Sequence, residues 1–465
     1  MNNRLIKASG WYFISSLFLK GIGLLTTPIF ARIMSEHDYG MLENFNALLS
    51  IMMIISSLSF SSTLVTARYD FSDKLSSYIK TGLVSTSVLN IVIFVVFLIA
   101  HEEILLFFQL NDAYFLIVFL VILFNPAFEI YIYFNQLSYK YKNISALNVI
   151  LGILGVVLSF VFIFLMNDDV FARALGSQLP FICVGLFIYF HYMANKNIIE
   201  FEFIKYAFPI CLPVVVHSFS GALLNSSDRI MITNIRGAED NAFYSLASSC
   251  GQLAYILWMA LNTAFIPWLS ENMKIKRFKD IYLFSKKYIL VYFTLIVGVI
   301  LISPDVLYIL GGHRYSEAKF AVPALIFGYT FLFLYSMFVN AEQIVKKTRG
   351  MAITTSLCAL INILLNYIFI PMYGYIAASY TTMIGYLIMF ISHHIIILKL
   401  KLNNLFDIKL MYCVAFISVV LSFVCPFLYN FYLLRLIALV IYIVALIFVF
   451  YRNKDNILAL LKNRN

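Results

Sequence analysis

The sequence predicts an all-α integral membrane protein with about 14 transmembrane helices. Its 465 residues are 62% hydrophobic and only 12% charged, and the mean hydropathy is +0.90. Soluble globular chains carry about 25% charged residues, so this composition excludes a soluble protein. At about 20 residues for each span, roughly 280 apolar residues supply about 14 helices joined by short connections.

Apolar runs of spanning length locate the individual helices. We expect helices at residues 10–31, 41–64, 80–100, 113–135, 144–166, 171–193, 206–227, 243–268, 288–311, 320–340, 351–371, 375–398, 409–429 and 433–451. The first run follows Arg4 and Lys7, as the core of a signal peptide would, but it is longer than such a core and no small-residue cleavage site follows it. It is therefore predicted to remain as the first helix.

The distribution of lysine and arginine tests this set of helices. Of the 33 basic residues, 25 fall on the side of the membrane that holds the N-terminus, seven fall on the other side, and Lys20 lies within a predicted span. Cytoplasmic loops carry an excess of Lys and Arg, so both termini are predicted to be cytoplasmic. The external connections are short and leave no room for a large external catalytic domain.

Charge and motifs exclude several classes of function. The net charge of +10 does not indicate nucleic acid, because the basic residues are scattered over many loops and form no single footprint. The six cysteines lie in apolar runs without a CxxC pair, which indicates buried thiols. The sequence has no P-loop, HExxH or GxSxG motif. We therefore expect no enzyme activity, cofactor, metal or nucleic-acid partner.

Two pairs of segments indicate an internal repeat. Residues 31–50 and 228–251 share an Arg-Ile-Met triplet followed by a turn and a second helix, at an offset of 197 residues. Residues 134–143 and 339–348 also match, at an offset of 205. The order of the matches predicts two halves of six helices with the same topology. Parallel repeats of this kind are typical of transporters, which handle the substrate between the halves.

The repeat also predicts a division of the chain. We expect an N-terminal six-helix lobe at 1–200 and a C-terminal six-helix lobe at 201–400. Residues 401–465 are predicted to form two additional transmembrane helices and a cytoplasmic tail.

Polar side chains recur at helical spacing on several predicted spans. Such residues are energetically expensive in a membrane and normally face the interior of the helix bundle or a water-filled cavity. Lys20 is the strongest case, because it is the basic residue deepest in a span. The candidate substrate-binding residues are Lys20, Glu43, Asn46, Glu129, Arg173, His217, Asp228, Arg229, Gln252 and Asn262.

Structural explanations compete with this interpretation. Lys20 would also be explained by a pair with Glu43 or Glu129 that only joins helices. Arg229 would also be explained by snorkelling from a helix end at the external face, with Asp228 fixing that end. His217 is also explained as a core histidine whose hydrogen bonds are satisfied.

Three segments resemble a known family. ARIMSEHDYGMLENFNALLS (31–50), DRIMITN (228–234) and NILLNYIFIPMYGYIAASYTTMIGY (362–386) resemble the polysaccharide-transporter branch of the multidrug/oligosaccharidyl-lipid/polysaccharide exporter superfamily. This branch includes the O-antigen and capsule-repeat flippases (Wzx-type). The resemblance covers nearly the whole chain, but its motifs are degenerate hydrophobic patterns.

The resemblance implies two six-helix lobes, as in the MATE transporters, that rock between inward-open and outward-open states. It implies an undecaprenyl-diphosphate-linked oligosaccharide as the substrate, moved across the bacterial cytoplasmic membrane for O-antigen or capsule synthesis. A polysaccharide polymerase and chain-length machinery are further candidate partners. A diphosphate needs cationic partners, so Lys20 with Arg173, Arg229 or Arg32 is the candidate diphosphate site.

Three alternatives remain open. A cation-coupled multidrug antiporter of the same superfamily would use acidic cavity residues, for which Glu43 and Glu129 are candidates. A lipid II flippase would also have 14 helices and a cationic cavity. An integral-membrane polysaccharide polymerase or ligase ranks last, because such enzymes generally carry a large external loop.

Overall fold

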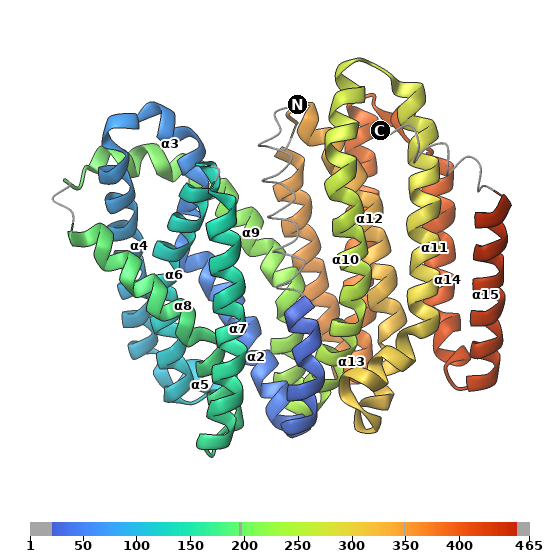
Figure 1. The fold of residues 1–465 in the computed structure, drawn as a ribbon, viewed down its shortest axis with the longest axis horizontal. Coiled ribbons are helices and arrows are strands. Elements are labelled where there is room, and N and C mark those ends of the chain that lie inside the picture. Colours follow the sequence, from blue (N-terminus) through green and yellow to red (C-terminus); the bar gives the residue numbers. More distant parts are fainter. Residues whose placement is uncertain (1–20, 139, 195–197, 348, 453–465) are drawn as a thin grey trace. The chain divides into compact units, whose positions relative to one another are not determined.

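The computed structural model describes residues 21–138, 140–194, 198–347 and 349–452, and within these ranges it contains helices and turns but no β-strand. An apolar helix at Gly21–Ile33 comes first. The long helices are α2 (Glu36–Ser57), α4 (Leu75–Ile99), α6 (Asp112–Leu137), α7 (Tyr141–Leu165), α8 (Asp169–Ala194), α9 (Phe201–Arg236), α10 (Ala238–Lys274), α11 (Phe278–Gly311), α12 (Val322–Ile344), α13 (Arg349–Lys399), α14 (Ile408–Leu428) and α15 (Tyr432–Arg452) (Figure 1).

These helices confirm the predicted membrane protein. Eleven are long and apolar enough to cross a membrane. One of the eleven, α13, counts as two, because Gly374 interrupts it with a φ of 62° that favours glycine. The shorter apolar helices Gly21–Ile33 and Tyr432–Phe448 fall where the first and last helices are predicted, and residues 10–20 of the first lie outside the described residues.

The structure corrects one predicted helix end. The helix expected at 206–227 continues as α9 to Arg236, so Arg229 lies inside a helix and does not end it. The polar residues Asp228 and Arg229 suggested that the helix ends there. They continue in helical geometry because their side chains have partners inside the protein. The connections also contain two short helices that the hydropathy pattern did not predict, α3 (Leu64–Asp70) and α5 (His101–Phe108).

The chain forms two compact units. Unit 1 comprises the described residues up to Ser245 together with Lys347–Met389, and unit 2 comprises Leu246–Lys346 together with the described residues from Phe390 onward. The unit boundaries fall within α10, in the connection between α12 and α13, and within α13. The predicted lobes are consecutive halves of the sequence, whereas the compact units are defined by contacts in space. The units therefore do not test the lobes expected at 1–200 and 201–400, which remain a prediction.

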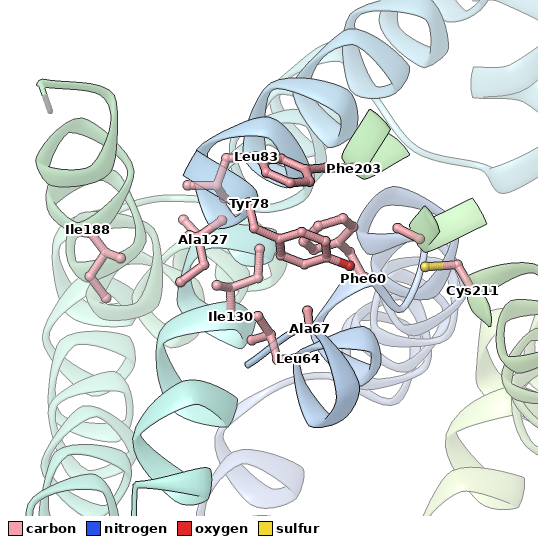
Figure 2. Packing of buried hydrophobic residues seen from close by; sticks show 12 residues of the cluster. Phe60, Leu64, Ala67, Tyr78, Leu83, Ala127, Ile130, Ile188, Phe203 and Cys211 are labelled. Carbon is pink, nitrogen blue, oxygen red and sulfur yellow. The ribbon is translucent and has the colours of Figure 1, made fainter. Parts of the chain in front are cut away.

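An aromatic cluster forms part of the core of unit 1 (Figure 2). The ring of Tyr78, from α4, stacks on Phe60 with 5.1 Å between centroids and meets Phe203, from α9, edge-on at 5.4 Å. The Tyr78 hydroxyl donates to Thr63 Oγ1 at 2.7 Å, so its polar end is satisfied. Aromatic pairs of this geometry add about 0.5–1.5 kcal/mol beyond burial, so the cluster ties the start of α9 to α4.

Buried asparagines join further segments of unit 1. The side-chain amide of Asn44 donates to the carbonyl of Phe108 at 2.8 Å, and that of Asn90 donates to the carbonyl of Ile122 at 2.7 Å. Asn241 donates to the carbonyl of Gly40 at 2.8 Å. Asn44 and Asn241 are 197 residues apart, which is the offset of the repeat, and both are fully buried.

In unit 2, α11, α12, α14 and α15 run side by side (Figure 1). The middle helix, α12, is the most buried candidate span. Its polar side chains have partners on α10, where Trp258 Nε1 donates to Ser336 Oγ at 2.9 Å and Asn262 Oδ1 accepts from Asn340 at 2.8 Å. Glu342 is paired with His393 of α13 at 2.8 Å.

We expect Gly40→Ala to prevent normal packing of unit 1. A Cβ atom at Gly40 would lie 1.7 Å from the carbonyl oxygen of Ala238, and backbone cannot move aside as a flexible side chain does. Overpacking costs about 1–3 kcal/mol or more, so the folded yield in size-exclusion chromatography should drop sharply. The matched control is Gly221→Ala, where no atom lies within 4 Å, and equal folded yields for the two variants would contradict the expectation.

Candidate substrate-binding site

An arginine and a glutamate meet in the interior of unit 1. Arg229 Nε, on α9, lies 3.4 Å from Glu43 Oε2, on α2, and both side chains are mostly buried. The arginine also donates to Ser245 Oγ and to the carbonyl of Asn225, each at 3.1 Å. Asn46 Nδ2 lies 3.4 Å from Glu43 Oε1. The structure thus brings together three of the predicted site residues.

A second arginine approaches the same carboxylate. Arg173, near the start of α8, interacts electrostatically with Glu43. Its NH1 donates to Ser159 Oγ at 2.7 Å, and its guanidinium lies 3.9 Å from the centroid of the Phe30 ring. Within the described ranges it forms no ion pair with a carboxylate. Arg229 thus pairs with Glu43, and Arg173 interacts electrostatically with the same carboxylate, while Asp228, next to Arg229, adds a second carboxylate to the region.

Asp228 is the acceptor of a buried hydrogen-bond network next to this pair. Its carboxylate, 1% exposed, accepts hydrogen bonds from Tyr244 at 2.5 Å, Asn366 at 2.5 Å and Thr382 at 2.6 Å. Thr381 in turn donates to the side-chain oxygen of Asn366. The network joins α9, α10 and both arms of α13, and it explains how a charged residue is accommodated inside α9.

Glu129 occupies a separate place in unit 1. Its carboxylate accepts a hydrogen bond from Asn125 at 2.9 Å, one helical turn earlier on α6, and another from Ser57 of α2. Asn125 and Gln178 line a cavity of about 250 Å³ between α2, α6 and α8, together with the rings of Phe128 and Phe181. Amides, a carboxylate and aromatic faces around a small space suit a hydroxylated ring.

The other predicted site residues lie elsewhere. His217 is half-buried on α9, eleven residues before Asp228 and about 16 Å away along an ideal helix. Gln252 and Asn262 belong to unit 2, where Asn262 accepts from Asn340. Lys20 lies outside the described residues. In the part of the chain that the structure describes, no group of three or more His, Cys, Asp or Glu residues is placed to hold a metal ion.

Sequence reasoning missed the partners of Asp228. Asn366 and Thr382 are 138 and 154 residues away along the chain, so no local pattern connects them to it. A weak signal existed, because Asn362 and Asn366 are four residues apart within an apolar run and therefore share one helix face.

A protein-family model matches the part of the chain that contains Glu43, Arg173, Asp228 and Arg229. The model of the family described as "Polysaccharide biosynthesis protein" matches residues 5–273, which is more than half of the chain. The chain belongs to this polysaccharide biosynthesis protein family. A second model, MatE, matches residues 213–368, so both models belong to the superfamily that the sequence resembles.

Curated relatives of this family member are distant. "Lsg locus putative protein 1" of Haemophilus influenzae is 24% identical over 282 residues, which cover 59% of this chain and 68% of the relative. An uncharacterised membrane protein of Methanocaldococcus jannaschii is 23% identical over 419 residues, which cover 83% of this chain and 82% of the relative.

Solved structures share the fold of this family member. The lipid II flippase MurJ in an inward-closed conformation superposes with a TM-score of 0.69 at 17% identity, over 96% of this chain and 99% of that structure. An inward-facing MATE multidrug transporter superposes with a TM-score of 0.61 at 14% identity, over 83% of this chain and 95% of that structure. The predicted MATE-like membrane fold is confirmed.

We expect Asp228→Asn to destabilise the protein. An asparagine offers one acceptor oxygen where the carboxylate offers two, so one donor among Tyr244, Asn366 and Thr382 loses its acceptor. Turning the Asn366 amide over would only transfer the loss to Thr381. An unpaired buried donor costs about 1–3 kcal/mol, so the thermal unfolding midpoint of the detergent-purified protein should fall.

The control for this measurement is Thr263→Val. Thr263 is exposed and donates only within its own helix, to the carbonyl of Met259. An unfolding midpoint for Asp228→Asn equal to that of this control would show that the network contributes little to stability.

Proposed function

We propose that this protein is a flippase for undecaprenyl-diphosphate-linked repeat units of a surface polysaccharide, such as an O-antigen or a capsule. It moves them by alternating access from the cytoplasmic to the outer leaflet of the bacterial cytoplasmic membrane. One observation carries the proposal: two arginines, Arg173 and Arg229, lie within membrane-spanning helices and interact with the same carboxylate, Glu43.

Arginines within membrane-spanning helices normally face the interior of the bundle or a substrate path. A charged side chain at the centre of a bilayer costs about 2.5–3.5 kcal/mol even on the lowest scales, so two arginines near one another on spanning helices favour a functional anion site. Guanidinium groups bind phosphate oxygens in a bidentate manner, which suits a diphosphate. The polyprenyl tail stays in the lipid, and the cavity beside Glu129 supplies polar groups for sugar hydroxyls.

The family and the charge distribution support the remaining parts of the proposal. Membership in a polysaccharide biosynthesis family favours a glycan precursor. The excess of basic residues on one side favours cytoplasmic termini. A polymerase and chain-length machinery are the partners that such a flippase would supply with substrate. We propose no catalytic step for this protein, because the proposed role of its candidate residues is to bind and orient a charged substrate.

Two other transporter functions have specific support. The MatE match and the carboxylates Glu43 and Glu129 favour a cation-coupled multidrug antiporter, and the MurJ superposition favours a lipid II flippase. Drug efflux from everted vesicles would favour the first alternative. Rescue of cells depleted of their essential lipid II flippase would favour the second. Restored surface polysaccharide in a strain that lacks this gene, without either activity, supports the proposal.

Arg173→Gln and Arg229→Gln should each reduce surface polysaccharide in a strain that lacks the chromosomal gene. Loss of one charge-assisted contact costs about 1.5–3 kcal/mol, so translocation should slow about tenfold to a hundredfold. Immunoblots of the variants must show wild-type levels of protein in the membrane. Because Arg229→Gln removes the ion-pair partner of Glu43, the double variant Glu43→Gln/Arg229→Gln separates a loss of folding from a loss of binding.

The matched control for the arginine variants is Lys205→Gln, which removes an exposed positive charge at the start of α9. It should leave polysaccharide synthesis unchanged. Wild-type synthesis by Arg173→Gln/Arg229→Gln would overturn the assignment of these arginines to the diphosphate.

Lys20→Ala, at wild-type expression, should also fail to restore surface polysaccharide. The lysine is placed within a span by the sequence, and its charge would join Arg173 and Arg229 in attracting the diphosphate. Full restoration would remove Lys20 from the proposed site and would favour its alternative role as a helix-joining residue.

A further inference from the structure

The most basic part of the chain belongs to unit 2 and has no role in the proposed site. Residues 274–287 and 399–409 together carry nine lysines and arginines but only two acidic residues, Asp280 and Asp407. The first segment leads into α11 and the second leads into α14, so both lie where predicted spans begin. Such clusters at a membrane surface attract anions.

A cavity of about 650 Å³ lies between these two helix starts. Lys279 and Tyr282 line it from α11, Asn403 and Asn404 line it from the connection between α13 and α14, and Lys409 lines it from the first turn of α14. Both lysines are exposed, as are both asparagines. The cavity therefore offers two positive charges and several hydrogen-bonding groups to one ligand.

The acidic residue in the cavity wall, Asp407, already has an ion-pair partner and a hydrogen-bond donor. Its carboxylate lies 3.3 Å from Lys286 Nζ and accepts from the backbone amide of Leu410 at 3.0 Å. Burial tends to raise the pKa of Asp407, but the Leu410 amide, the Tyr282 hydroxyl and Lys286 together bring this pKa below its usual value. Asp407 thus remains ionised and paired with Lys286, and it leaves Lys279 and Lys409 available to an anion.

Apolar side chains line part of the cavity. Phe278, in the first turn of α11, is 43% exposed, and Ile408, at the start of α14, lies in the same wall. A free inorganic anion would gain nothing from these groups. An amphiphile would place its charged head on the lysines and its hydrocarbon chains over the apolar surface.

We propose that this cavity binds the headgroup of an anionic phospholipid of the surrounding bilayer. Lys279 and Lys409 contact the phosphate, Asn403, Asn404 and Tyr282 contact headgroup hydroxyls, and the acyl chains cover Phe278 and its apolar neighbours. Basic pockets between transmembrane helices are known to bind such headgroups. This site is independent of the proposed flippase function, because it uses different residues and a different ligand.

The test compares lipid binding by the full-length wild-type protein and by Lys279→Gln/Lys409→Gln, both purified in a neutral detergent. Native mass spectrometry measures the bound fraction during titration with phosphatidylglycerol, and separately with phosphatidylcholine of the same acyl chains. The wild type should prefer phosphatidylglycerol, and the double variant should bind it about tenfold to thirtyfold more weakly. Equal unfolding midpoints of the two lipid-free proteins show that both are folded.

The matched control is Lys274→Gln/Lys287→Gln, which removes two exposed charges from the same segment but none from the cavity wall. It should keep the wild-type preference. An equal loss in this control would overturn the site in favour of general attraction by the basic surface. Equal wild-type affinity for both lipids, or inorganic phosphate competing as strongly as phosphatidylglycerol, would overturn the phospholipid as the ligand.

Discussion

The need to satisfy every polar group inside a membrane constrains this structure more than any other requirement. Hydrocarbon offers no hydrogen bonds, so a polar side chain on a spanning helix must find its partner within the protein, on its own helix or on another. Asp228 gathers donors from α10 and from both arms of α13, and buried asparagines tie α2, α4 and α10 to carbonyls of neighbouring segments. Each such contact also fixes the register of two helices, because only one rotation of each helix brings donor and acceptor together.

The arginine pair differs from these groups in its chemistry. Asp228 accepts hydrogen bonds from three side chains, whereas Arg173 and Arg229 both interact with the carboxylate of Glu43. The hydrogen bonds of Asp228 join three helical segments, and the two guanidinium groups present the donors that phosphate oxygens bind. A structural role for Asp228 and a ligand-binding role for the arginines are therefore our proposal, although the sequence places Asp228 and Arg229 side by side.

The sequence was informative wherever the signal was local. Apolar runs located the long helices of the described residues, because one property of about 20 consecutive residues decides whether a segment spans. Glu43, Asn46 and Arg229 were recognised as site candidates because polar residues in spans rarely lack a purpose. The extension of α9 to Arg236 and the partners of Asp228 were not predictable, since both depend on residues that only the folded chain brings near. Lys20 remains an inference from sequence.

The hydrogen bond from Asn241 to the carbonyl of Gly40 has a consequence for the origin of the fold. It joins the second repeat to the first, whereas the equivalent Asn44 bonds to Phe108 within the first repeat. The asparagines at matching positions of the two predicted repeats therefore donate to carbonyl groups of different segments. If the repeat arose by gene duplication from a half-length ancestor, the bond from Asn241 corresponds to a contact between two subunits of an ancestral homodimer. Fusion into one chain made that contact permanent, and an isolated second half of the present protein would leave this buried asparagine without its acceptor.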